Sequence, residues 1–155
     1  MALALGVSFA GETPTIMKEI PTTPANQTRT TLRYEADFNT TPQRLYAVLT
    51  DAKQFAAFTG MPAEIDARDG GACSLFGGLI GARNIELVPN QRVVQAWRSK
   101  SWDPGVYSIV SFELSPKGTQ THLVLDHHGF AEGLAEHLDA GWKTRYLAAL
   151  AKMFN

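Results

Sequence analysis

The chain has 155 residues, 45% of them hydrophobic, which is enough to bury a sizeable core but leaves no room for a second domain. Fourteen Lys and Arg against fifteen Asp and Glu give a net charge of −1 without blocks of either sign, so nucleic acid is not expected as a partner. The single cysteine, Cys73, excludes an internal disulfide and a multi-cysteine metal site.

The first 30 residues differ in composition from the rest. Met1 to Ala10 is apolar and ends in small residues, like the end of an export signal, but lacks a charged start. Residues 11–30 combine prolines with Thr, Asn and Gln, which is typical of a linker. We therefore expect residues 1–30 to be a flexible extension or the remnant of an export signal, and residues 31–155 to be one domain. We expect a cytoplasmic location, with export as the alternative.

One strand and two short helices are predicted next. Residues 31–38 alternate between apolar and polar side chains, which predicts a half-buried strand. Thr40 or Thr41 can cap the helix that follows. Asp51 starts a second short helix, which carries two phenylalanines and ends at Gly60.

A strand-and-turn pattern then repeats as far as residue 127. Gly70-Gly71 and Lys117-Gly118 are two of the pairs that separate the runs. Short connections join antiparallel neighbours, because a parallel pair needs a long crossover, so we expect an antiparallel meander. The expected strands are residues 64–68, 72–76, 79–88, 92–98, 107–114 and 120–127.

A long helix is predicted over residues 132–154, with an apolar side chain at every fourth position from Leu134 to Phe154. Gly141 lies inside it, and because glycine costs a helix about 1 kcal/mol relative to alanine, we expect a close approach to a strand there. The elements together predict an α+β fold in which a curved antiparallel sheet of six or seven strands wraps around the long C-terminal helix. Two short helices lie between the first two strands.

Four stretches together resemble one protein family. They are residues 76–89 (FGGLIGARNIELVP), residues 94–98 (VQAWR), Trp102 through residues 107–108, and Gly141-Trp142. Their order and spacing resemble the activator-of-heat-shock-protein-90-ATPase-like family over about residues 31–154. The resemblance implies the helix-grip fold of the START-like (SRPBCC) superfamily, which includes lipid-transfer domains and polyketide cyclases. Only the smaller domain of the chaperone activator is matched, so chaperone regulation does not follow by default.

Large ring side chains are the candidate ligand site. A sheet curved around a helix can leave a gap that such side chains line rather than fill, and a gap of this kind is the default ligand site. The candidates lie on elements expected to border that gap, and ordinary core packing is the alternative for each of them. They are Phe55, Phe58, Phe76, Trp97, Trp102, Tyr107, His127 and Trp142.

Polar residues offer weaker signals. Arg98 is either solvated or placed at the mouth of the gap, where it would pair with an anionic ligand head. His127 and His128 point to opposite faces of a strand and cannot easily bind one metal ion together. Cys73 is interpreted as a small buried hydrophobic residue. We expect no catalytic residues, no metal and no cofactor.

Three functions stay open from the sequence. Our first interpretation is non-enzymatic binding of a small apolar or amphipathic ligand between sheet and helix, by a monomer or homodimer. The alternative, motivated by the family resemblance, is a chaperone-associated interaction module with a chaperone as partner. A second alternative is a cyclase-like or hydrolase-like enzyme that uses Arg98, Glu113, Asp126 or His127 in its pocket.

Overall fold

The computed structural model of the chain describes residues 30–155. The expected N-terminal extension, with its linker and export-signal interpretations, lies outside the described residues apart from residue 30. Among residues 30–155, no helix is long and apolar enough to cross a membrane.

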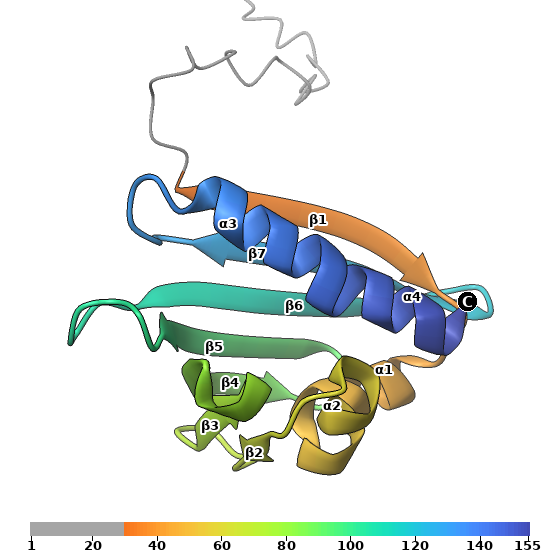
Figure 1. Cartoon of the computed structure of the whole chain (residues 1–155). Helices are drawn as coiled ribbons and strands as arrows, with labels where there is room; N and C mark the ends of the chain where they lie inside the picture. The colour runs from red at the N-terminus through yellow and green to blue at the C-terminus, as the bar shows by residue number, and fades with distance from the viewer. Residues whose placement is uncertain (1–29) are drawn as a thin grey trace, which may run out of the picture.

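Seven strands in the described part of the chain form one antiparallel sheet, as the strand-and-turn pattern predicts. The spatial order is β1-β7-β6-β5-β4-β3-β2, so β2 to β7 form a meander and the first strand pairs with the last. Figure 1 shows the long C-terminal helix lying across one face of this sheet, which confirms the expected helix-grip architecture. The strands are β1 (Thr31–Phe38), β2 (Glu64–Ile65), β3 (Ala72–Leu75), β4 (Ile80–Val88), β5 (Arg92–Ser99), β6 (Ser108–Lys117) and β7 (Gln120–His128).

Alternation along the strands separates a buried inner face from a wet outer face. On β6, Phe112 is buried beneath the helices, whereas Ile109 points outward and is 43% exposed. The outer face carries ion pairs between neighbouring strands, such as Arg33 to Asp126 at 2.8 Å. Exposed pairs contribute little to stability, so the apolar inner face supplies most of the stabilisation.

Two short helices follow β1, and both caps that the sequence predicts are present. The helices are α1 (Pro42–Thr50) and α2 (Ala52–Thr59). The Thr41 side chain accepts a hydrogen bond from the backbone N–H of Arg44, and the Asp51 side chain accepts one from that of Gln54. Gly60 ends α2 in the left-handed conformation, at a φ of 71°.

The C-terminal helix contains a wider turn that keeps its apolar stripe on the sheet. The segments are α3 (Ala135–Gly141), the π-helical η2 (Trp142–Leu147) and α4 (Ala148–Phe154). In an ideal α-helix, each step of four residues rotates the stripe by about 40°, which would carry it off the sheet. The i to i+5 turns of η2 rotate it back. Trp142, Tyr146, Leu150 and Phe154 are therefore all buried.

The expected close contact at Gly141 is wrong. A Cβ atom added at Gly141 would have no atom of another element within 4 Å, so no strand approaches the helix there. Gly141 instead borders a pocket, described below. No packing contact therefore explains why a glycine, which lowers the stability of the helix, occupies this position. Its missing side chain leaves space beside the helix.

Several element ends differ from the sequence prediction. β2 stops at Ile65 because the backbone turns: the N–H of Arg68 bonds to the carbonyl of Asp66, and that of Gly71 bonds to Arg68. Phe76 and the two glycines after it form a short 3-10 turn, η1 (Phe76–Gly78), so β3 stops one residue earlier than expected. β6 begins at Ser108 rather than one residue earlier, which matters for the site.

Candidate functional site

Two stacked tryptophans join the long helix to the middle of the sheet. Trp97 on β5 and Trp142 at the start of η2 lie with ring centroids 4.8 Å apart and planes 19° from parallel. They are 4% and 2% exposed. Tyr146, one turn further along the helix, lies 4.5 Å from Trp142, and Phe112 stacks on Tyr146 at 5.9 Å. These four rings pack against one another, so Trp97 and Trp142 help to fill the gap that they were expected to line.

His127 anchors one of the two indoles. Trp142 Nε1 donates to His127 Nδ1 at 2.9 Å, and the other ring nitrogen lies 2.7 Å from Ser108 Oγ. Because an indole N–H can only donate, Nδ1 must be unprotonated, so the neutral ring carries its proton on Nε2 and donates it to Ser108. Ser108 Oγ in turn donates to the carbonyl of Trp97 at 3.4 Å. Burial, and to a lesser degree the neighbouring His128, lowers the pKa of His127 to about 4.

A second polar chain anchors the other indole. Trp97 Nε1 donates to Gln95 Oε1 at 3.1 Å, and Gln95 Nε2 donates to Asn84 Oδ1 at 2.9 Å. Asn84 Nδ2 donates to the carbonyl of Asp66 at 2.8 Å. Both buried tryptophans therefore have their N–H groups satisfied, which removes the cost of burying them unpaired.

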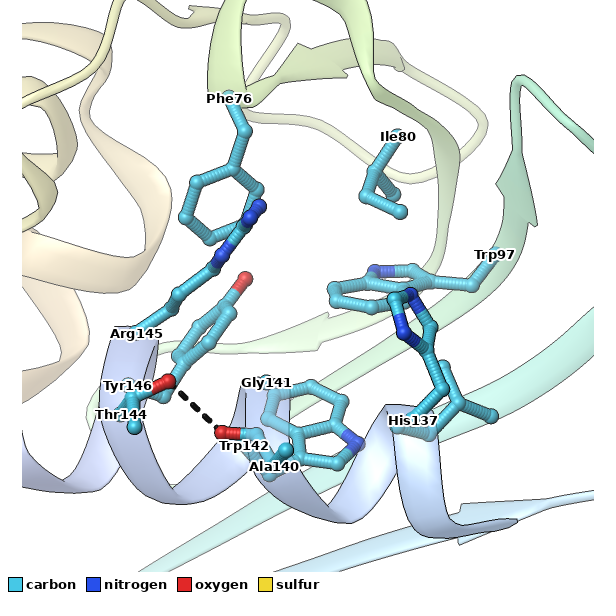
Figure 2. Close-up of a pocket in the computed structure, with 11 residues that line it drawn as sticks. Phe76, Ile80, Trp97, His137, Ala140, Gly141, Trp142, Thr144, Arg145 and Tyr146 are labelled. Carbon is cyan, nitrogen blue, oxygen red and sulfur yellow. Dashed lines mark hydrogen bonds between the residues drawn. The ribbon is translucent and has the colours of Figure 1, made fainter. Parts of the chain in front are cut away.

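Tyr146 closes the cluster and turns its polar end toward a pocket. Phe55 and Phe58 of α2 pack edge-on against its ring, with centroids 5.9 and 5.8 Å away, and Phe76 does so at 5.5 Å. Burial raises the pKa of the Tyr146 hydroxyl well above its usual value, so the group stays protonated. Within residues 30–155 this hydroxyl makes no hydrogen bond, and Figure 2 shows it pointing into the space between Phe76 and Trp97.

This space is a half-open pocket of about 230 Å³ beside the long helix. Its inner wall is apolar, whereas Arg145 and His137 stand at the helix side (Figure 2). The Arg145 guanidinium lies 5.7 Å from the centre of the Phe76 ring, a cation-π contact that keeps a positive charge at the rim. The lining residues are Phe76, Ile80, Trp97, His137, Leu138, Ala140, Gly141, Trp142, Thr144, Arg145 and Tyr146.

The structure brings only some of the predicted ligand-site residues to this pocket. Phe76, Trp97 and Trp142 line it. Phe55, Phe58 and His127 lie in the packed core and do not line it. Trp102, in the β5–β6 loop, packs half-buried against the core and does not line the pocket. Ligand binding by these residues stays a prediction.

Tyr107 was expected to face the long helix, and this placement is wrong. Ser108, the first residue of β6, is buried on the inner face, so the residue before it points the other way. Tyr107 is 55% exposed and borders a second hollow, on the outer face of the sheet.

The sequence analysis missed three residues that line the pocket. Tyr146 and Arg145 supply its polar groups, and Gly141 leaves space in its wall. Tyr146 was recognised as part of the apolar stripe, but a stripe does not show which member ends in open space. Arg145 lies next to that stripe within the π-helical segment, and its place at the pocket could be predicted only if the π turn was known.

In residues 30–155, the polar residues that the enzyme alternative would use do not come together in one pocket. His127 faces inward, whereas Asp126 pairs with Arg33 and Glu113 pairs with Arg92 on the outer face. In residues 30–155, no group of three or more His, Cys, Asp or Glu side chains could hold a metal ion. Burial raises the pKa of the Cys73 thiol, which disfavours a reactive thiolate.

The curved antiparallel sheet and the long helix across it define a START-like helix-grip domain. Residues 39–155 match the family described as "Activator of Hsp90 ATPase homolog 1-like protein", and the chain belongs to this family. The sequence is 30% identical over 117 residues to the human "Activator of 90 kDa heat shock protein ATPase homolog 1". That match covers 76% of this chain and 35% of the human protein, so the chain spans about a third of the curated relatives' length.

Solved structures agree with this assignment. An Hsp90 activator from Plasmodium falciparum superposes with a TM-score of 0.76 at 26% identity, over 81% of this chain and 96% of that one. The Aha1 dimer from Colwellia psychrerythraea has a TM-score of 0.67 at 18% identity, over 79% of this chain and 97% of that one. The latter likeness shows the fold alone.

The buried His127 predicts a pH dependence of stability. Its folded pKa of about 4 lies below the ordinary 6.5, so between these values the unfolded chain binds the extra proton and the folded chain does not. Stability from this group is complete above pH 6.5 and is lost as the pH falls toward 4, by roughly 3 kcal/mol in all. Urea unfolding from pH 7.5 to 4.5 measures this loss.

The variant His127→Gln isolates the contribution of His127 titration to the pH dependence of stability. A glutamine can accept from Trp142 and donate to Ser108 but does not titrate, so the variant should lose less stability than the wild type over this range. His137→Gln, on the exposed side of the long helix, is the matched control and should keep the wild-type dependence. Parallel curves for wild type and His127→Gln would contradict the assignment.

Proposed function

We propose that this chain is a chaperone-associated interaction domain that binds an Hsp90-type chaperone and changes the rate of its ATPase. The observation that carries the proposal is similarity across nearly the whole folded domain, residues 39–155, to proteins named as activators of this ATPase. The chain also covers 96% of the solved Plasmodium activator, so a chain of about this extent bears that name.

The interior of the domain is consistent with a protein partner. Trp97, Trp142, Tyr146 and Phe112 pack against one another between helix and sheet, and the pocket beside them is about 230 Å³. Pockets for drug-sized ligands run from roughly 300 to 1,000 Å³. A large lipid inside the grip therefore has little support, and the outer surface is the better place to look for a partner.

The test uses the full chain and an Hsp90-type chaperone from the organism that encodes it. We expect saturable binding by isothermal titration calorimetry and a severalfold change in the ATPase rate of the chaperone. A competitive blocker of the chaperone's ATP site is the control, because it removes the chaperone's share of the measured hydrolysis. A folded chain that neither binds nor changes the rate would exclude the proposal.

A second candidate function is binding of a small amphipathic molecule in the half-open pocket. It is favoured by the Tyr146 hydroxyl, which opens into the pocket, stays protonated and makes no hydrogen bond among residues 30–155. A bound polar atom would satisfy this hydroxyl, Trp97 and Ile80 would contact an apolar part, and Arg145 would attract an anionic end. A small ligand of this kind is compatible with a chaperone partner at another surface.

Gly141 variants test the pocket. Gly141→Met places a side chain beside the pocket space, whereas Gly141→Ala adds a Cβ that would have no atom of another element within 4 Å. Non-denaturing mass spectrometry of the purified full chain should show an extra mass that disappears on denaturation. The mass should persist in Gly141→Ala and fall in Gly141→Met. A bare polypeptide, or equal retention in both variants, would count against the pocket.

A further inference from the structure

A second hollow, of about 350 Å³, lies on the outer face of the sheet, across the strands from the tryptophan stack. Its floor is made of small residues, because Gly81 and Ala96 lie where larger side chains would fill the space. Arg83 and Arg98 border it, and the strand register places them diagonally across β4 and β5: Gly81 faces Arg98, and Arg83 faces Ala96. The lining residues are Cys73, Gly81, Ala82, Arg83, Ala96, Arg98 and Tyr107.

The two arginines differ from the other cations of this face in lacking a carboxylate. Arg33 pairs with Asp126, Arg92 with Glu113 at 2.6 Å, and Lys117 with Asp37. In the described residues, neither Arg83 nor Arg98 forms an ion pair. Glu64 shares the outer face but is separated from Arg98 by two strands, which at the usual strand spacing is about 14 Å. The hollow therefore carries two positive charges without a direct carboxylate partner among residues 30–155, although Asp69 precedes Gly70 and Asp103 follows Trp102 in the segments that the two arginines bond.

Backbone carbonyls hold both guanidinium groups in place. Arg83 Nη1 donates to the carbonyl of Gly70 at 2.6 Å, and Arg98 Nη2 donates to that of Trp102 at 2.6 Å. Arg98 Nε also points to the carbonyl of Asp103, at 3.4 Å. A guanidinium has five N–H donors, so most of them stay available to a ligand. Side chains oriented in advance lose less entropy when they bind.

Apolar surface adjoins the arginines. Tyr107 is 55% exposed at the edge of the hollow, and Ile109, which faces Ala96 in the strand register, is 43% exposed. Tyrosine and arginine are enriched among the residues that contribute most to protein–protein binding. The combination suits a protein segment better than a free inorganic anion, because an anion has no use for exposed apolar side chains.

We propose that this hollow is the docking surface for an acidic segment of a partner protein, with carboxylates paired to Arg83 and Arg98 and an apolar side chain against Tyr107. This inference rests on the proposed function, and it assigns the surface and the chemistry by which the chaperone is held. The carboxylate pairs fix the position of the segment and speed its encounter, so binding weakens as salt concentration rises.

The first test compares two pairs of arginines on the same sheet face. Binding of the chaperone to full-length Arg83→Gln/Arg98→Gln should weaken at least about tenfold, since each variant site loses a charge-assisted pair. Arg33→Gln/Arg92→Gln removes the same net charge from arginines that are already paired, and its dissociation constant should change less than twofold. Arg83→Lys keeps the positive charge and therefore separates loss of charge from misfolding. It should bind the chaperone more tightly than Arg83→Gln.

The second test works without the chaperone. A hexaglutamate peptide is titrated into the ¹⁵N-labelled full chain, and the backbone amides and arginine Nε–H signals are followed by NMR. The expected shifts centre on Gly81, Arg83, Arg98 and Tyr107. Shifts centred on Arg33 and Arg92, or no shifts, would overturn the proposed site.

The two tests separate the two proposals. Chaperone binding that both double variants leave intact would overturn the docking surface while the proposed function stands. Peptide binding at the hollow with no chaperone binding at all would overturn the proposed function and leave an acidic protein segment as the ligand class.

Discussion

The contact between Trp97 and Trp142 determines how the long helix crosses the sheet. Stacking alone would let one ring slide over the other, but hydrogen bonds fix both N–H groups. The Trp97 N–H bonds to Gln95, which bonds to Asn84 on β4. The Trp142 N–H bonds to His127 on β7. Burying two tryptophans contributes several kcal/mol only if both N–H groups are satisfied, because an unpaired buried donor costs about 1–3 kcal/mol. The two polar chains therefore give the apolar stack one position.

The rest of the inner face follows from that position. The π turn begins at Trp142, so the same residue that makes the stack also marks the change of helical pitch. Tyr146 then reaches Phe112 on the sheet and the phenylalanines of α2, which brings α2 against the end of the long helix (Figure 1). The half-open pocket is the space between Tyr146, Phe76 and Trp97, and it stays open because Gly141 contributes no side chain there.

Local patterns predicted the elements well and the site only in part. β1 and the Asp51 cap were predicted residue by residue, and the first cap was narrowed to Thr40 or Thr41, because alternation and capping depend on neighbours in sequence. The strict spacing of four residues from Leu134 to Phe154 was itself a sign of a π turn, since an α-helix would not keep it on one face. Tyr107 could also have been placed correctly by counting back from Phe112 in steps of two. Whether the rings line a gap or fill it depends on the distance between helix and sheet, which no local pattern encodes.

The two tryptophans lie stacked with both N–H groups bonded, and the proposed partner therefore binds outside the filled interior. Hydrogen exchange of the three indole N–H groups, measured by NMR, tests this arrangement directly. Trp97 and Trp142 should exchange slowly, near the rate of global unfolding, whereas Trp102, whose N–H makes no hydrogen bond in residues 30–155, should exchange fast. Fast exchange of the Trp97 or Trp142 N–H group in the folded protein would mean an open, water-accessible interior, and the two tryptophans would then not be locked together.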